Sequence, residues 1–344
     1  MTPTALRTAG PARGTLVLAC CGVLLPLSVL LAVGTGSADI PPLEVARTLG
    51  AHVGLPWAPL PPLRDSIVWD LRLPRVLLAA LVGAGLAVCG TVLQALTRNP
   101  LADPYLLGVS AGASTGAVLV LVLGLGTLGL PAGAFAGAMA AFGCVLLLLG
   151  RTPGTATRVV LSGVVASQLF SALTSLVVVY SGDAERTRAV TFWLLGSLAA
   201  ADWTSVGICA ATVAAGLPLC LLYATHLDAL AFGRETAATL GFSPRRVETS
   251  LFAVTAVVTG ALVAASGAIG FVGLLVPHAA RILTRASHRL LLPCAAALGA
   301  LFLVWADTAA RTLFGPRDLP VGVLTALLGV PAFALLLRRR TGAP

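Results

Sequence analysis

The chain has 344 residues, of which 58% are apolar or aromatic and only 10% are charged, and its mean hydropathy is +0.97. Soluble globular proteins carry about 25% charged residues, so this composition excludes a water-soluble domain and indicates an integral membrane protein. The formal net charge is +9, and all 22 basic residues are arginines. Without lysine the chain cannot form the GxxxxGK(S/T) loop of a P-loop ATPase or a lysine Schiff base. The arginines stand singly between apolar runs, which disfavours nucleic-acid binding.

The first four membrane spans are predicted from charge-free runs, since about 20 apolar residues cross a bilayer. Residues 14–38 could also be a secretory signal peptide, but they are longer than its apolar region of about 7–15 residues and lack a clear cleavage site. We therefore expect a retained first helix. The run at 76–97 predicts the second span. Residues 104–150 are too long for one helix and break between Gly124 and Pro131, which predicts two spans.

Six further spans follow from the rest of the chain. Residues 249–280 supply two of them, because the run breaks around Ser266 and Gly267. The apolar piece at 189–201 is too short to cross and predicts a re-entrant or surface helix. The other four spans are the single runs 159–182, 203–227, 290–306 and 319–337. We therefore expect an all-α polytopic membrane protein with about ten transmembrane helices.

An even number of spans places both termini on one side of the membrane, and the distribution of charge selects that side. With the termini inside, the inner segments hold 14 of the 22 arginines and a net charge of +10, and the outer segments carry −1. We therefore expect cytoplasmic termini. The prediction is one transmembrane domain over residues 1–344, with cytoplasmic segments at 1–13, 225–247 and 338–344.

Candidate metal and catalytic sites are scarce. The seven cysteines lie in apolar runs without CxxC spacing, and the four histidines are scattered, whereas metal sites need clustered ligands. No metal site is predicted. An ion-coupled carrier normally needs carboxylates or broken helices at the midplane of the membrane, and a hydrolase needs grouped catalytic side chains. Neither pattern is evident, which disfavours a secondary transporter and an intramembrane enzyme.

Two sequence patterns in the spans concern packing or a passage. Glycines spaced by four at Gly108, Gly112 and Gly116, and at Gly133 and Gly137, predict close helix packing within the subunit or a dimer seam.

In the fifth span, Gln168, Ser171 and Ser175 share one helix face, with Ser167 and Thr174 beside them. Two interpretations are open: the stripe lines a water-filled passage, or it makes the ordinary hydrogen bonds by which Ser and Thr join membrane helices.

Two loops stand out. The inner loop at 225–247 alternates small, apolar and charged residues, which favours two short helices that meet at Gly233 and dock a soluble partner. A plain connector is the alternative, although 23 residues are long for one. The outer face carries Arg72, Arg75 and Arg311, which suit an acidic partner. These arginines could instead pair with nearby carboxylates, namely Asp70, Asp307 or Asp318.

The stretch from Leu71-Arg-Leu-Pro-Arg75 through Gly90-Thr-Val-Leu-Gln-Ala-Leu-Thr-Arg-Asn-Pro-Leu-Ala-Asp-Pro-Tyr105 to Ala113 resembles the permease subunits of FecCD-type ABC importers. Further resemblances are Leu230-Ala-Phe-Gly-Arg-Glu-Thr-Ala-Ala-Thr-Leu-Gly241, the run at 267–278 and the run at 319–331. Members of this family import ferric siderophores, haem and cobalamin through the bacterial inner or plasma membrane. The resemblance implies the type II ABC importer permease architecture, with ten helices and both termini inside.

The resemblance also implies the partners. A second permease subunit, identical or a sister chain, two ATP-binding cassette subunits and an extracytoplasmic substrate-binding protein complete such an importer. The permease is not an enzyme and binds no cofactor, because the ATPase subunits use ATP and Mg. Ferric siderophore is the expected cargo, with haem or cobalamin as the alternative and an ion-coupled secondary transporter as a less favoured one.

Residue by residue, the resemblance implies three sites. Arg72, Arg75 and Arg311 would dock the binding protein. The ATPase-coupling segment corresponds to residues 228–241, with Gly233, Arg234, Glu235, Ala238, Leu240 and Gly241; many relatives have two acidic residues after the glycine, where this chain has Arg234 and then Glu235. The fifth and tenth helices line the pathway in the family, which favours a pathway role for Gln168, Ser171 and Ser175.

Overall fold

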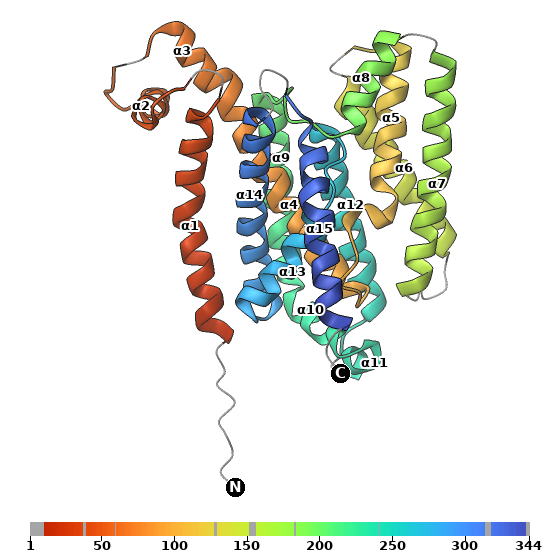
Figure 1. Cartoon of the computed structure of the whole chain (residues 1–344). Helices are drawn as coiled ribbons and strands as arrows, with labels where there is room; N and C mark the ends of the chain where they lie inside the picture. Colours follow the sequence, from red (N-terminus) through yellow and green to blue (C-terminus); the bar gives the residue numbers. More distant parts are fainter. Residues whose placement is uncertain are drawn as a thin grey trace, which may run out of the picture.

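The computed structural model describes residues 10–36, 39–58, 60–126, 129–150, 156–181, 184–239, 241–313 and 318–341. Every regular element in these ranges is a helix, and the long helices stand side by side as a bundle (Figure 1). Seven of the described helical runs are long and apolar enough to cross a membrane: α1 (Gly10–Gly34), α4 (Leu73–Leu96) with the turns before it, α6 (Gly129–Leu149), α7 (Ala156–Ser181), α9 (Trp203–Leu222), α12 (Pro244–Ser266) and α14 (His288–Thr312). Three apolar helices are shorter: α5 (Val109–Leu123), α13 (Val272–Thr284) and α15 (Val321–Thr341). Each corresponds to one of the ten predicted spans.

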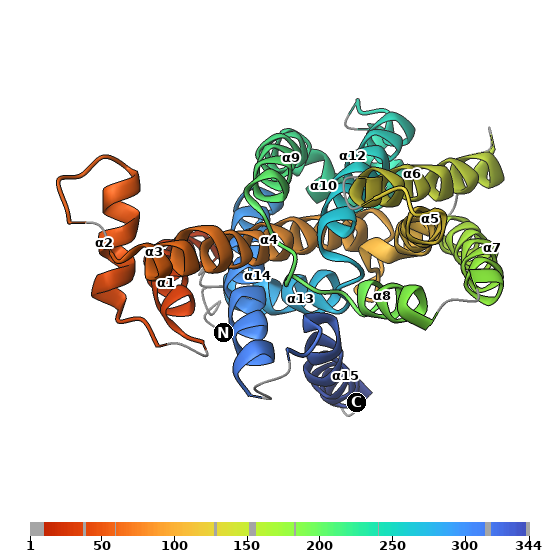
Figure 2. The ribbon, with the colours of Figure 1, turned by 90° about the horizontal axis from the view of Figure 1, so that it is seen from above.

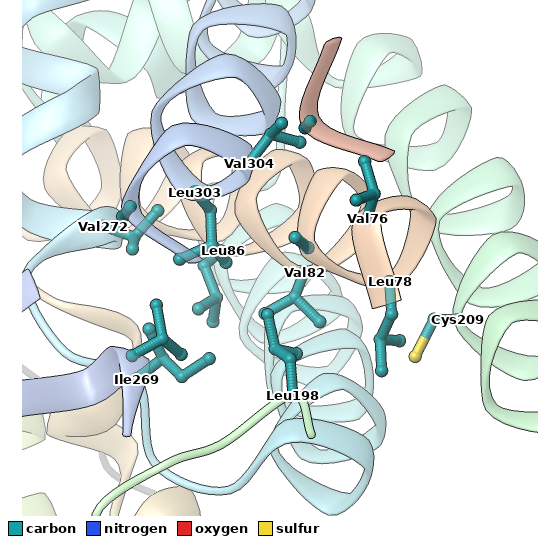
Figure 3. Packing of buried hydrophobic residues seen from close by; sticks show 14 of the residues in the cluster. Val76, Leu78, Val82, Leu86, Leu198, Cys209, Ile269, Val272, Leu303 and Val304 are labelled. Atoms are coloured by element: carbon teal, nitrogen blue, oxygen red, sulfur yellow. The ribbon is translucent and has the colours of Figure 1, made fainter. Parts of the chain in front are cut away.

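Helix α4 forms the centre of the bundle, with α14, α13, α9 and α12 packed around it (Figure 2). In its most apolar stretch 83% of the residues are buried, compared with 22% in α1 and in α7. Glycines let the neighbouring backbones approach: a Cβ at Gly90 would lie only 1.8 Å from the carbonyl oxygen of Gly273. Figure 3 shows Val82 and Leu86 of α4 packed near Leu303 of α14. Because lipid is as apolar as these side chains, close van der Waals packing stabilises the contact.

The spaced glycines of α5 and α6 pack against each other within the subunit. A Cβ at Gly116 would lie 2.0 Å from the Gly133 oxygen, and one at Gly112 would lie 2.3 Å from the Gly137 oxygen. Both glycine pairs lie in the contact between α5 and α6, so the prediction of close packing within the subunit is confirmed for these residues.

The predicted break after Ser266 is confirmed, and it is wider than a simple turn. Helix α12 ends at Ser266 and α13 begins at Val272, with non-helical backbone between them. The Tyr105 hydroxyl accepts a hydrogen bond from the Ile269 N–H and donates one to the Ile269 carbonyl, both at 2.8 Å. Such backbone is tolerated in a membrane only where protein or water satisfies it. The sequence predicted a boundary between two spans here but not this length of non-helical backbone, so the case against an ion-coupled carrier rests on the carboxylates alone.

The structure corrects two predicted boundaries. The short helix α8 covers Ala184–Leu194 instead of 189–201, and the residues after it are non-helical up to Asp202, whose side chain caps α9 by accepting from the Ser205 N–H at 2.8 Å. Hydrogen bonds to this cap hold the pKa of Asp202 below its usual range. The predicted span at 203–227 ends at Leu222, where the separate helix α10 (Ala224–Ala231) begins.

The region between the first two spans contains helices that the sequence analysis did not predict. Helices α2 (Pro42–His52) and α3 (Pro62–Ser66) are joined by a turn, and a π-helical segment, η1 (Ile67–Arg72), leads into α4. Prolines at both helix starts supply the fixed φ that suits a first turn. These elements lie beside α1 at one end of the bundle, and α10 and α11 (Arg234–Thr239) lie at the other end (Figure 1).

Candidate functional site: two ends and one flank of the bundle

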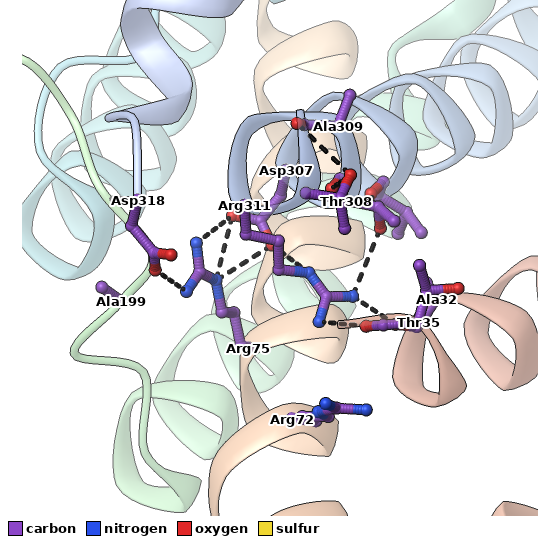
Figure 4. A network of polar contacts seen from close by, with 12 residues as sticks. Ala32, Thr35, Arg72, Arg75, Ala199, Asp307, Thr308, Ala309, Arg311 and Asp318 are labelled. Atoms are coloured by element: carbon purple, nitrogen blue, oxygen red, sulfur yellow. Dashed lines mark hydrogen bonds and ion pairs between the residues drawn. The ribbon is translucent and has the colours of Figure 1, made fainter. Parts of the chain in front are cut away.

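Arg75 is the centre of an ion-pair network at the end of the bundle where α4 begins (Figure 4). Its Nε and Nη2 atoms donate to the Asp307 carboxylate at 3.0–3.1 Å, and its Nη1 donates to Asp318 at 2.8 Å. The Asp307 side chain is 1% exposed and that of Asp318 is 47% exposed. Arg75 therefore joins a buried carboxylate of α14 to an accessible one that precedes α15. We call this side of the molecule the Arg75 end.

The other two predicted arginines tie α1 into the same network. Arg72 is buried, and its Nη1 donates to the carbonyl oxygens of Val33 and Gly34, both at 3.0 Å. Arg311 lies 3.7 Å from Asp307 and donates to the carbonyl of Thr35 at 2.8 Å and to that of Ala32. These carbonyls lie at the C-terminal end of α1, where the carbonyl oxygens of a helix receive no hydrogen bond from a later N–H of the same helix. The three arginines thus lie together at the adjoining ends of α1, α4 and α14.

The sequence left open which carboxylates pair with these arginines. Asp307 and Asp318 do so, and Asp70 is exposed on η1. Most of the arginine hydrogen-bonding capacity at the Arg75 end is therefore committed inside the subunit. Docking of an acidic partner at these residues stays a prediction, and Asp318 is the accessible group that such a partner would displace.

The opposite end carries the two short helices predicted for the inner loop. Helices α10 and α11 meet at Gly233, whose φ of +115° only glycine adopts readily. Arg234 pairs with Glu248 at the start of α12 and is partly buried, and Glu235 and Ala238 are exposed on α11. Gly241 follows with φ +84°, and Leu240 lies outside the described residues. We call α10 and α11 the Gly233 hairpin.

Contacts that the sequence analysis missed hold the Gly233 hairpin to the bundle. Asp228 of α10 accepts from His288 Nδ1 at 2.6 Å and from the His288 N–H at 3.1 Å, which fixes α10 to the start of α14. The His226 ring lies 4.3 Å from the Phe242 ring. Next to this region Phe232 is 81% exposed. Phe232 is therefore a large apolar surface residue beside α11, where the sequence predicts docking of a soluble partner.

On α7 the structure separates the polar residues that the sequence grouped. Thr174 is buried and shares a 2.8 Å hydrogen bond with Thr115 of α5, as interhelical Ser and Thr often do. Gln168, Ser171 and Ser175 are exposed on the free side of α7, and Ser175 only returns a hydrogen bond to the Ser171 carbonyl. Thr174 thus makes a hydrogen bond to another helix, whereas the three predicted pathway residues face away from the neighbouring helices. Their role in the pathway stays a prediction.

A groove of about 560 Å³ runs along α15 and the end of α8. Figure 2 shows α8 between α7, the helix with the polar stripe, and α15, the helix that lines most of the groove. The groove lining is uncharged: Leu194, Leu195, Ala268, Gly322, Val323, Ala326, Leu327, Val330 and Pro331. No group of three or more His, Cys, Asp or Glu residues is close enough to hold a metal ion within the described ranges.

Comparison with known proteins decides the family. Residues 24–339 match the FecCD transport family. The chain belongs to this family. It is 41% identical to the hemin transport system permease protein HmuU of Yersinia pestis, over 93% of this chain and 95% of that protein. It is 43% identical to the cobalamin import system permease protein BtuC of Halobacterium salinarum, with 87% and 85% covered.

Among solved structures, the chain resembles a metal-chelate type ABC transporter in an inward-facing conformation, with a TM-score of 0.83 and 30% identity. The match covers 94% of this chain and 99% of that one. The FecCD protein described here is thus a multi-pass membrane protein with the fold of ABC transporter permeases, and its relatives are permease subunits of importers.

Proposed function

We propose that this FecCD protein is the transmembrane permease of an ATP-driven importer for ferric siderophores, working by alternating access at a permease dimer interface. Its partners are a second permease subunit, two ATPase subunits that use ATP and Mg, and an extracytoplasmic binding protein. The observation that carries the proposal is the separation of three features. A basic network lies at one end, an exposed docking hairpin lies at the other, and an uncharged groove with a polar stripe lies along the flank between them.

The Gly233 hairpin is the coupling element in this proposal. It contacts α4 and α14 through α10, and it contacts α12 through the Arg234–Glu248 pair. A partner that seats on Phe232, Glu235 and Ala238 would therefore move three helices of the bundle together. Arg234 faces Glu248 instead of the surface, which leaves Glu235 as the acidic contact for the ATPase.

The Arg75 end is the docking surface for the binding protein, and the termini face the cytoplasm. An acidic partner competes with Asp318 for Arg75, because the Asp307 contact is buried. Replacing Asp318 with asparagine should strengthen docking of the binding protein, measured by surface plasmon resonance on nanodisc-bound transporter. Asp202→Asn is the matched control, since it removes an exposed carboxylate on the same end that makes its contacts within α9. Equal affinity for both variants would contradict docking through Arg75.

The cargo follows from the groove and the family. Uncharged walls suit a large chelate that shields its metal, and no residue of the groove coordinates iron. Haem or cobalamin is the second candidate, favoured by the same apolar lining and by the names of two relatives. Competition of radiolabelled ferric siderophore uptake by unlabelled siderophore, haem and cobalamin distinguishes them: only the true cargo competes at low concentration.

Coupling is tested with the complete transporter in proteoliposomes. Phe232→Ala and Glu235→Gln should lower cargo transported per ATP hydrolysed, because both side chains form the proposed ATPase contact. Leu123→Ala is the control, since Leu123 is 66% exposed on α5 away from the Gly233 hairpin. Unchanged transport per ATP in the first two variants would place the coupling surface elsewhere.

A further inference from the structure

The turn between α2 and α3 exposes an unusual amount of apolar surface. We define the 41–66 hairpin as α2, α3 and the described residues around them, 41–58 and 60–66. Five of its large apolar side chains are exposed by 47–79%, namely Leu43 65%, Val53 79%, Leu55 49%, Trp57 47% and Leu63 76%, whereas Val45 is buried in the core. Single exposed apolar residues are ordinary, but a run of them in a compact hairpin marks a surface that meets another apolar phase.

The hairpin is an ordered structure and not a loose connector. The Leu55 N–H donates to the Gly50 carbonyl at 2.8 Å, and the Trp57 ring covers Gly50 so closely that a Cβ there would lie 2.2 Å from it. Arg64 bonds Glu44 at 2.7 Å, which joins α3 to α2. The turn therefore has a fixed backbone that exposes Val53 and Leu55, while Trp57 is half exposed over Gly50.

The position of the hairpin identifies what covers it. Figure 1 shows α2 crossing beside the end of α1, and Figure 2 shows the hairpin outside α1, on the far side of α4 from α7. Helix α1 is itself open to lipid along its length, with Leu16 64% and Val23 72% exposed. The apolar surface of the hairpin thus continues the lipid-facing surface of α1. It lies away from the groove and the polar stripe, where a second permease would join.

The charges of the hairpin argue for lipid over a soluble partner. Glu44 and Arg64 pair with each other, and His52 lies 3.6 Å from Asp65. These four side chains are thus paired within the hairpin, and the turn presents Val53, Leu55 and Trp57. Arg47 of α2 is exposed, and an arginine on the polar face of an in-plane helix suits lipid headgroups. Tryptophan and in-plane amphipathic helices are enriched at the membrane–water interface.

We propose that the 41–66 hairpin is a membrane-interface anchor, with α2 in the headgroup layer beside α1 and its turn among the upper acyl chains. The anchor is rigidly joined to the permease core. The His52 ring stacks on Trp69 of η1 at 3.9 Å, and Trp69 lies 4.9 Å from Trp203 of α9. Lipid contact at the turn therefore sets the depth of η1 and of the α4 start, which carries Arg72 and Arg75.

The test uses the full chain in vesicles whose phospholipids are brominated near the headgroup end of the acyl chains. Comparison of wild type with Trp57→Phe isolates the Trp57 fluorescence. The anchor predicts that this fluorescence is quenched by the brominated lipid and protected from aqueous acrylamide. Trp305→Phe is the control, because Trp305 lies within the span of α14 and isolates a signal that acrylamide should not reach.

Two outcomes would overturn the anchor. Acrylamide quenching of Trp57 without bromine quenching would place the turn in water. Protection from acrylamide that arises only when binding protein is added, or only at high protein-to-lipid ratio, would make the surface a protein interface. A second readout uses Val53→Asp and Leu55→Asp, which should release Trp57 to acrylamide; Val53→Ser, which adds no charge, should do so less. None of these measurements depends on transport.

Discussion

Asp307 is the residue whose removal should damage the Arg75 end most. Its side chain is 1% exposed and contacts two guanidinium groups, Arg75 at 3.0 Å and Arg311 at 3.7 Å, whose side chains are 13% and 7% exposed. In Asp307→Asn both cations stay buried while their shared negative charge is lost. Breaking a buried ion pair in this way costs about 3–5 kcal/mol.

The matched variant is Asp318→Asn, which removes the other carboxylate bound to Arg75. Because Asp318 is 47% exposed, water replaces its hydrogen bond, and the expected cost is about 0–1 kcal/mol. The assay is unfolding of the purified permease in mixed micelles with increasing sodium dodecyl sulfate, followed by circular dichroism. The midpoint should fall clearly for Asp307→Asn and hardly for Asp318→Asn.

A double-mutant cycle checks the cause. Arg75→Gln combined with Asp307→Asn should cost less than the sum of the single changes, with a coupling free energy of about 1 kcal/mol or more. If the two aspartate variants have equal midpoints, or if the cycle shows additivity, the reasoning from burial and charge is refuted.

Three further predictions concern packing and pH. Gly116→Val should lower the free energy of unfolding by about 1–3 kcal/mol, because the larger side chain overpacks the contact between α5 and α6. Gly143→Ala is the control and should not lower it, because no atom lies within 4 Å of the added carbon. Thr174→Val should cost about 0.6 kcal/mol, and Ser175→Ala, on the exposed face, should cost nothing measurable; the reverse order would contradict the assignment of faces. Burial raises the pKa of Asp103 to about 6 against the lowering effect of the Tyr105 N–H. The folded state thus binds the Asp103 proton more tightly than the unfolded state does. The resulting stabilisation is present below about pH 4 and is lost as the pH rises through about 6. Asp103→Asn should therefore make the free energy of unfolding less dependent on pH between those values.

The sequence predicted the spans well because a bilayer imposes a length and a composition on each of them. Uncharged runs and Gly or Pro breaks located α5, α6, α12 and α13. The 41–66 hairpin escaped because its run without acidic or arginine residues, 48–63, is shorter than a span and is interrupted by prolines. The end of α8 also differed, since non-helical backbone at this place is satisfied by tertiary hydrogen bonds such as that from the Ser197 N–H to the Ser266 carbonyl.

Within the candidate site, residue types were predictable but partners were not. The arginines near Asp307 and Asp318 could be recognised, yet only the fold brings Arg72 to the carbonyls that end α1. Likewise, Thr174 and Ser175 are neighbours in sequence, and the packing of α5 against α7 decides that one is buried and the other exposed.

The central claim, ATP-driven import through this permease, is tested most directly by uptake of radiolabelled ferric siderophore into proteoliposomes that hold the complete transporter. The account predicts uptake that requires ATP, the ATPase subunits and the binding protein, and that falls in the Glu235→Gln variant while ATP hydrolysis continues. Uptake by the permease alone, driven by an ion gradient and unaffected by ATP, would contradict it.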